Sequence, residues 1–170
     1  MVGLRDDSNY ERKTCCFTGH RDLSSSDRDL IERQLEPTLV RLIESGVCFF
    51  GAGGALGADT YFELAVLKLK HRYPHIKLIL VLPCHSQTRG WKEEDIRVYE
   101  EIKSKADKVV YTSEEYTKGC MHKRNRHLVD HSGTCIAFFK RPNGGTKYTW
   151  DYAQRSGLVM INLAAGDSFR

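Results

Sequence analysis

The chain has 170 residues, 41% of them hydrophobic, which is enough for one domain with a full core, and no change in composition marks a second domain. The sequence has neither a basic-then-apolar leader nor an apolar run of about 18 residues, so we expect a cytoplasmic protein without membrane contact. The formal net charge of +4 at pH 7 is mild and excludes neither an anionic small molecule nor nucleic acid as a partner.

Residues 1–12 are polar and without periodicity, which predicts a flexible leader before a single domain at 13–170. Six short apolar or β-branched runs then predict strands, at 14–18, 47–50, 76–82, 108–111, 135–139 and 158–163. Apolar residues at i, i+3 and i+4 predict helices between them, at 26–45, 59–72, 93–106, 121–132 and 146–156. This alternation indicates an α/β fold, a three-layer Rossmann-like sandwich with a mainly parallel sheet.

A glycine-rich turn follows the second predicted strand, over residues 51–59. Glycine permits close approach of a ligand to the backbone, and the amides at the start of the next helix carry partial positive charge. A nucleotide or related phosphorylated ligand is therefore the leading hypothesis. The glycines fit neither the G-x-G-x-x-G phase nor the Walker pattern, and an ordinary tight turn is the alternative. The predicted ligand-binding residues of this turn are Gly51, Gly53, Gly54, Gly57 and Asp59.

The loops after the other predicted strands carry histidine, arginine, threonine and glycine, which are suited to recognition of phosphate and ribose. In parallel α/β sheets, ligands bind at the carboxyl ends of the strands, where the strand order reverses. The further predicted ligand-binding residues are Thr18, Gly19, His20, Arg21, Pro83, Arg124, Asn125, Gly144, Gly145 and Thr146.

Three of these residues each have an alternative role. Arg21 fits a bidentate phosphate contact or a surface ion pair with Asp22 or Asp27. Asp59 fits hydrogen bonds to ribose hydroxyls or a cap on the helix that starts there. His20 has no carboxylate beside it in the sequence, which favours a hydrogen-bond donor over an acid or base.

Four motifs occur in order along the chain: CCFTGHR at 15–21, GGALGAD at 53–59, M-x-x-R-N at 121–125 and NGGT at 143–146. Together they resemble the YpsA-like branch of the SLOG superfamily, named after the Smf/DprA proteins and the LOG phosphoribohydrolases. The resemblance implies a domain that binds a nucleotide or nucleotide-derived ligand, with no further cofactor, as a sensor or regulatory module. It implies ligand contacts at Gly19, His20, Arg21, Gly57, Asp59, Gly144, Gly145 and Thr146.

One departure from the LOG enzymes bears on catalysis. Those enzymes cleave the base from a nucleoside 5′-monophosphate and carry a glutamate shortly after a Pro-Gly-Gly-x-Gly-Thr loop. Here residues 147–150 contain no carboxylate, and Asp151 is the nearest one after the corresponding loop. Hydrolysis of an N-glycosidic bond is therefore the alternative to binding alone, and no catalytic residue is assigned.

A DNA-binding module like the Smf/DprA proteins is a further alternative. Basic residues between 118 and 147 are interleaved with aromatic residues, but most of these aromatics fall on predicted core elements, so nucleic acid is not favoured. The sequence also leaves a homo-oligomer open.

Cysteine and histidine residues raise the question of a metal site. His127 and His131 lie one helical turn apart, near Cys120 and His122. His122 lies on a different side of the helix from the other two histidines, so the sequence predicts no metal site. Five of the six cysteines lie in or beside apolar runs, which is typical of reduced core cysteines.

Overall fold

The computed structural model describes residues 7–142 and 144–165, and within them six strands form one parallel sheet. The strands are β1 (Thr14–Gly19), β2 (Phe49–Ala52), β3 (Lys77–Leu82), β4 (Lys108–Tyr111), β5 (Thr134–Phe138) and β6 (Val159–Asn162). The helices are α1 (Asp7–Arg12), α2 (Ser25–Glu44), α3 (Ala58–Leu69), α4 (Glu93–Lys105), α5 (Cys120–Asp130), α6 (Gly144–Arg155) and a 3-10 turn (Leu163–Ala165). All six predicted strands and all five predicted helices are present, which confirms the predicted fold.

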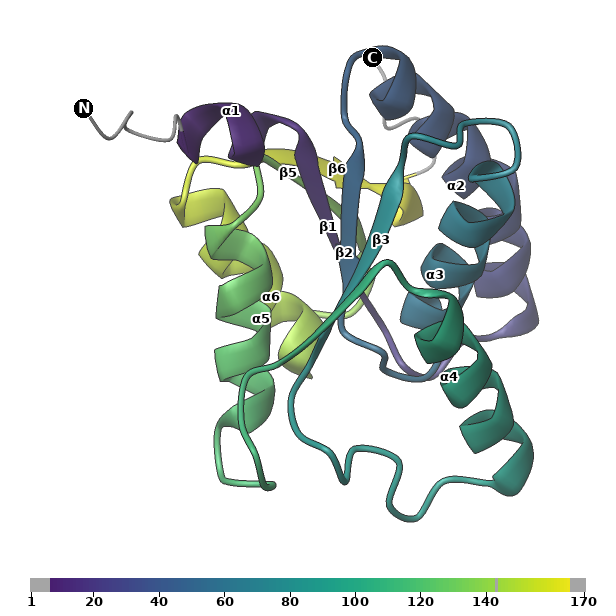
Figure 1. The fold of residues 1–170 in the computed structure, drawn as a ribbon, viewed down its shortest axis with the longest axis vertical. Helices are drawn as coiled ribbons and strands as arrows, with labels where there is room; N and C mark the ends of the chain where they lie inside the picture. The colour runs from purple at the N-terminus through teal and green to yellow at the C-terminus, as the bar shows by residue number, and fades with distance from the viewer. Residues whose placement is uncertain (1–6, 143, 166–170) are drawn as a thin grey trace.

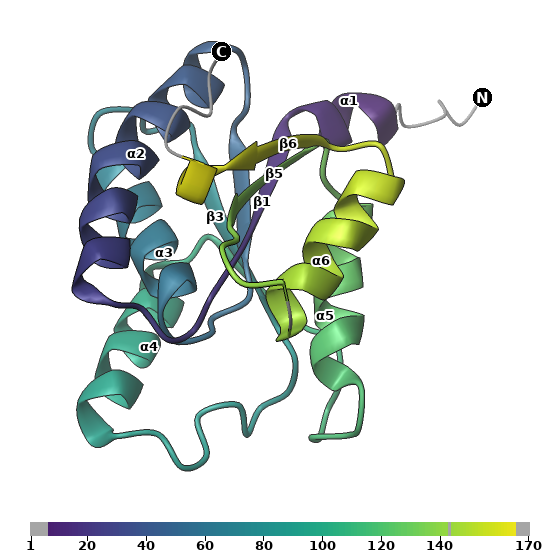
Figure 2. The same ribbon diagram turned by 180° about the vertical axis from the view of Figure 1, so that it is seen from behind.

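The strand order is β4-β3-β2-β1-β5-β6, so the chain builds outward from β1 to β4, returns across the sheet and continues through β5 to β6. Right-handed crossovers place the helices of the two halves on opposite faces. Accordingly α2, α3 and α4 cover one face, and α5 and α6 cover the other (Figures 1 and 2). The strand order reverses between β1 and β5, and their carboxyl ends open between the two helical layers.

β1 and β5 are buried on both faces because helices cover both faces of the sheet. Every residue of β5 is buried, and β1 is buried up to its last residue. On one face Phe17 of β1 stacks on Phe62 of α3, with ring centroids 4.6 Å apart. On the other face Cys16 and Cys135 pack beneath α5 and α6. None of the helices in the described part of the chain is long and apolar enough to cross a membrane.

The segment predicted as a flexible leader is partly described. Residues 1–6 lie outside the described residues, whereas residues 7–12 form α1. The Tyr10 carbonyl accepts a hydrogen bond from Oγ1 of Thr14 at 2.7 Å, and the Tyr10 ring centroid lies 4.9 Å from that of Phe49. These contacts attach α1 to the amino ends of β1 and β2.

The loop after β1 crosses the start of α3 at very short range. The Ala58 amide donates a hydrogen bond to the His20 carbonyl at 3.1 Å. A Cβ at Gly57 would lie 2.2 Å from the carbonyl oxygen of Arg21, and a Cβ at Gly19 would lie 2.5 Å from the Cβ of Ala58. The close approach that Gly57 permits is therefore to the chain's own backbone.

We predict that Gly57→Ala destabilises the fold by about 3 kcal/mol or more, because its φ of +82° disfavours a side chain and the added Cβ collides with backbone. Gly157→Ala is a matched control, since Gly157 has the same φ of +82° but open space around it, and it should cost only about 1–2 kcal/mol. Urea unfolding of both variants measures the difference. Equal losses would contradict the steric role of Gly57.

Candidate functional site

A pocket of about 490 Å³ opens at the switch point between β1 and β5. Its walls come from the end of β1 and the loop after it, the glycine loop after β2, the loop after β5, one side of α5 and the start of α6. We call it the switch-point pocket. Most of the predicted site residues line it, namely Thr18, Gly19, His20, Arg21, Gly53, Asp59, Arg124, Asn125, Gly144, Gly145 and Thr146.

The other predicted site residues lie outside the lining of this pocket. Gly57 faces the backbone of Arg21, and Gly51 and Gly54 line two other cavities. Pro83 is buried after β3. Sequence reasoning also omitted lining residues, among them Arg141 and Met121. Met121 and Asn125 are four residues apart and so share a helix face, which is the signal that could have identified Met121.

His20 is held as a hydrogen-bond acceptor inside the wall of the pocket. Its Nε2 accepts the backbone amides of Lys140 at 2.9 Å and Arg141 at 3.1 Å. Burial, followed by the charge of Arg141, lowers the pKa of His20, which keeps the ring neutral near pH 7. The proton of the neutral ring therefore resides on Nδ1, which remains available as a donor. The two hydrogen bonds to Nε2 join the loop after β1 to the loop after β5.

An ion pair between buried Asp27 and half-exposed Lys140 reinforces the same junction. Asp27 caps α2 by a reciprocal pair of hydrogen bonds with Ser24, and its other carboxylate oxygen accepts from Nζ of Lys140 at 2.7 Å. The hydrogen bond from Lys140 is the largest cause that lowers the pKa of Asp27 to about 2. Asp27 is thus the partner of Lys140 and not of Arg21.

Two exposed arginines stand at the rim beside this junction. The guanidinium carbon of Arg21 lies 5.6 Å from the ring centroid of Trp91, and Nη2 of Arg141 donates to the Asp22 carbonyl at 2.8 Å. Both arginines line the switch-point pocket. Arg141 contacts the backbone carbonyl of Asp22 and not its carboxylate. This contact therefore does not neutralise the charge of the guanidinium group.

The first turn of α6 forms the adjacent wall. Gly144 has a φ of +81°, and a Cβ added at Gly144 or Gly145 would meet no atom within 4 Å. Thr146 is buried in the same turn, whereas Asn143, the first residue of the NGGT motif, lies outside the described residues. The first amides of a helix lack intrahelical acceptors and present partial positive charge. This wall is therefore open, glycine-lined and rich in backbone donors.

The glycine loop after β2 has a different character, because its amides already have partners. The Asp59 carboxylate accepts from the Ala55 amide at 3.1 Å and from the Gly53 amide, and Glu63 accepts from the Gly54 amide. Two carboxyl groups thus occupy the donors that would otherwise bind a phosphate.

Arg124 of α5 completes this cluster from the opposite helical layer. Its Nη1 donates to the Gly53 carbonyl, which also accepts from Nε2 of Gln87 at 2.9 Å, and its Nε donates to Oδ1 of Asn125 at 2.7 Å. Burial raises the pKa of Asp59 to about 6 against the opposing charge of Arg124. Burial and the neighbouring Asp59 raise the pKa of Glu63 well above its usual range.

The candidate metal ligands of α5 do not form a metal site in the described part of the chain, where no three His, Cys, Asp or Glu side chains are grouped to hold an ion. His127 and His131 stack on each other with ring centroids 4.2 Å apart, while His122 stacks on Tyr148 instead.

Comparison with known proteins identifies the family of this chain. The family model YpsA, described as the YspA SLOG family, matches residues 15–158. The chain belongs to the YpsA family of the SLOG superfamily. It is 30% identical over 121 residues to the uncharacterized SPbeta prophage-derived protein YoqJ of Bacillus subtilis, which covers 64% of this chain and 71% of YoqJ. It is 29% identical over 119 residues to a UPF0398 protein of Brevibacillus brevis, covering 69% of this chain and 63% of that protein.

Solved structures share the fold of this YpsA-family chain. DNA processing protein A (DprA) of Streptococcus pneumoniae superposes with a TM-score of 0.66 at 19% identity, over 88% of this chain and 49% of that one. Helicobacter pylori DprA, whose structure is described in terms of its single-stranded DNA binding mode, gives a TM-score of 0.62 at 20% identity, over 89% and 65% of the two chains. The chain therefore corresponds to about half to two thirds of these DprA proteins, and the likeness shows the Rossmann-like fold.

We predict that Asp27→Asn lowers the free energy of unfolding at pH 7 by about 1–2 kcal/mol, because the lost charge weakens the contact with the half-exposed Lys140. The folded-state pKa of Asp27 is lowered to about 2, below the unfolded value of about 3.9, so its stabilisation is present above pH 4 and is lost as the pH falls toward 2. Urea unfolding at several pH values measures this. Exposed Asp29→Asn is the control at pH 7 and should cost under about 0.5 kcal/mol. A difference between wild type and Asp27→Asn that stays constant down to pH 2 would refute the role of the charge.

Proposed function

We propose that this protein binds a nucleotide or nucleotide-derived ligand in the switch-point pocket and acts as a sensor or regulatory module. The observation that carries the proposal is the pocket's polarity: Arg21, Arg141 and the open first turn of α6 all line it. A phosphate placed there would meet guanidinium groups and helix amides together, which is the combination that binds anions in many proteins.

The occupied glycine loop argues for the same placement. A phosphate beside Gly53 and Ala55 would compete with the Asp59 carboxylate for the same amides and would be repelled by its charge. Asp59 instead offers an acceptor to ligand hydroxyls, such as those of a ribose. The loop then serves the sugar end of the ligand, and α6 serves the phosphate end.

The α5 wall supplies a surface for the base. Met121, His122 and Asn125 line the pocket, and the His122 ring stacks on Tyr148 with centroids 3.9 Å apart and planes 5° from parallel. A base can pack on a thioether and an aromatic ring while an amide reads its polar edge. A volume of about 490 Å³ falls within the usual range for a site of this kind.

Free, buried cysteines support a reducing compartment. All six cysteines are unpaired, and all except Cys48 are buried. Such cysteines persist in the cytoplasm, where thiols stay reduced, and we propose that location.

Replacement of Gly145 by valine tests the phosphate site. The added side chain meets no protein atom within 4 Å at its Cβ, so Gly145→Val should fold normally, yet it should fill the space in front of the α6 amides. A thermal-shift and calorimetry panel of AMP, ADP-ribose, NAD and unphosphorylated adenosine should first show a phosphate-dependent ligand. We expect Gly145→Val to weaken that ligand at least tenfold. Gln154→Val, exposed on the same helix, is the control and should bind like wild type. Unchanged affinity of Gly145→Val for the ligand would show that the phosphate does not bind at the first turn of α6.

We further predict binding without release of the base. The carboxylates that line the pocket among the described residues are Asp22 and Asp59, and Asp59 is engaged with the glycine loop. Asp151 pairs with Lys147 at 2.5 Å and lines another depression, and Glu114 pairs with His85 at 3.5 Å. Loss of a base needs a carboxylate near the sugar and an acid near the base. Chromatography of nucleoside monophosphates after hours of incubation should show no free base. Release that disappears in Asp59→Asn would instead establish a hydrolase.

Single-stranded nucleic acid is the second candidate, and one observation supports it. The His122, Tyr148 and Tyr152 rings stack in series along α5 and α6, beside exposed Lys123 and Arg126. Stacked rings next to cations suit unpaired bases and their phosphates. Anisotropy of a labelled oligonucleotide at low and moderate salt tests this. Salt-sensitive binding that Tyr148→Ala weakens would support it, and salt-independent or unaffected binding would not.

A further inference from the structure

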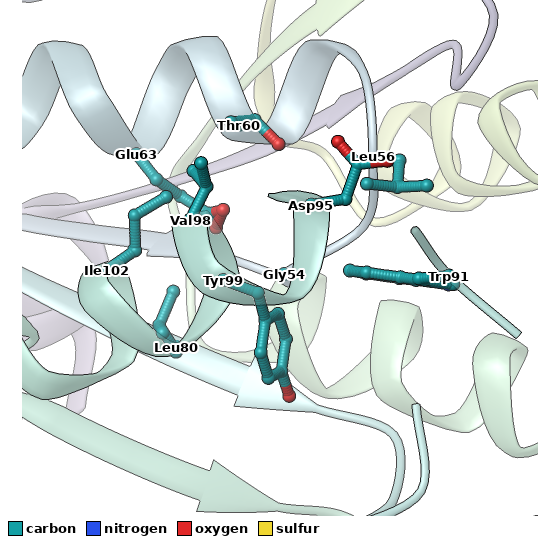
Figure 3. A pocket seen from close by; sticks show the side chains of 10 residues that line it. All are labelled: Gly54, Leu56, Thr60, Glu63, Leu80, Trp91, Asp95, Val98, Tyr99 and Ile102. Atoms are coloured by element: carbon teal, nitrogen blue, oxygen red, sulfur yellow. The ribbon is translucent and has the colours of Figure 1, made fainter. Parts of the chain in front are cut away.

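A second cavity, of about 100 Å³, lies between α3 and α4 above β3 and is separate from the switch-point pocket (Figure 3). Thr60 and Glu63 face it from α3, and Asp95 and Tyr99 face it from α4. Trp91, in the loop before α4, forms one end, and the exposed Val98 borders it. The cavity thus joins carboxyl groups with aromatic and aliphatic walls.

Glu63 is the unusual member of this lining. Its side chain is only 2% exposed, and its Oε2 has no hydrogen-bond partner within the described chain. Figure 3 shows the Glu63 carboxyl group directed into the space between the two helices. A buried polar atom without a partner costs free energy, and in a native protein it calls for an explanation such as a bound water or ion.

The charges around Glu63 do not balance. Asp59 and Glu63 are both buried, and they share one buried guanidinium, that of Arg124. Two carboxylates and one guanidinium would leave one excess negative charge in a region of low dielectric. Without a ligand a proton removes this excess charge, consistent with the raised pKa of Glu63. A cation in the cavity could take the place of that proton.

We infer that the α3–α4 cavity binds a primary alkylammonium group, carried by a free amine or by a lysine side chain. The three N–H donors of such a group match the carboxyl groups of Glu63 and Asp95 and the hydroxyl of Thr60. The Trp91 and Tyr99 rings, 5.5 Å apart and nearly perpendicular, offer aromatic surface to a cation. The alkyl chain would contact Leu56 and Val98.

The structure favours an organic cation over a metal ion here. No metal-binding group of three His, Cys, Asp or Glu side chains exists in the described residues, and the walls are largely aromatic and aliphatic. A hard cation prefers six or more oxygen ligands, which this cavity does not offer.

Binding should release a proton from Glu63, so the affinity should rise with pH. The groups that face Glu63 are Asp59 on its own helix, Arg124 from α5, and Tyr99 and Asp95 from α4. The Arg124 guanidinium and the alkylammonium both stay charged from pH 5.5 to 8. Glu63, whose pKa is raised, and Asp59, whose pKa is about 6, form the titrating pair that the ligand would drive toward ionisation.

The test is a titration of the full-length protein with n-butylammonium chloride, followed through the indole N–H signal of Trp91 in two-dimensional NMR. Neutral n-butanol, with a chain of the same length, is the matched ligand control. We expect saturable binding of the cation that tightens as the pH rises from 5.5 to 8, and at least tenfold weaker binding of the alcohol. The N-acetyl methylamide of lysine distinguishes the sources, since binding equal to that of butylammonium points to a lysine side chain and much weaker binding points to a free amine.

Two variants complete the test. Glu63→Gln removes the charge at constant shape and should weaken butylammonium at least tenfold, whereas Val98→Trp fills the mouth of the cavity and should block it with Glu63 intact. Thermal unfolding confirms that each variant is folded. Absence of saturable binding, equal binding of the alcohol, or binding unaffected by both variants would overturn the proposal. Failure of nucleotide binding in the switch-point pocket would leave it untouched, because the two sites are assayed with different ligands.

Discussion

The buried guanidinium of Arg124 is the contact on which the carboxyl edge of the sheet depends. It comes from α5, on one face of the sheet, and its charge acts on the buried carboxyl groups of Asp59 and Glu63 in α3, which covers the other face. By donating to the Gly53 carbonyl it also fixes the loop between them. A buried charge is costly unless hydrogen-bond acceptors and opposite charges compensate it, so this guanidinium favours one arrangement of the two helical layers and the loop. That arrangement determines the positions of the walls of the switch-point pocket.

The sequence predicted the fold well because the patterns that define it are local. Apolar runs, helical periodicity and strict alternation located all six strands and the five helices α2 to α6, but not α1 (Asp7–Arg12). The rule for parallel sheets placed Thr18, Arg124 and Gly144 at one edge. What could not be predicted was which partner each backbone amide finds. The glycines at 53 and 54 resemble a phosphate-binding loop in sequence. In the structure, however, Asp59 and Glu63, in the first two turns of α3, accept hydrogen bonds from the amides of this loop. Similarly, His20 accepts hydrogen bonds from the backbone amides of Lys140 and Arg141. No short-range sequence pattern could predict this contact, because the partners are about 120 residues apart.

The two cavities share one structural element, the glycine loop. Gly53 lines the switch-point pocket and Gly54 lines the α3–α4 cavity, so the same turn of backbone separates them. Asp59 accepts hydrogen bonds from the Gly53 and Ala55 amides of this turn, and Glu63 accepts one from the Gly54 amide. Occupation of either cavity changes the electrostatic surroundings of the same pair of carboxyl groups, and linkage requires that any such coupling act in both directions.

The central place of β1 also governs how the protein forms during synthesis. β1 pairs with β2 on one side, at Cys16 and Gly51, and with β5 on the other, at Cys16 and Cys135. The first partner leaves the ribosome soon after β1, but the second follows only when most of the chain has been made. Until then one edge of a strand that is apolar on both faces has no neighbour, and an open edge of this kind is a template for association with other chains. Nascent chains that stop short of residue 134 are therefore the species in which aggregation of this protein should concentrate.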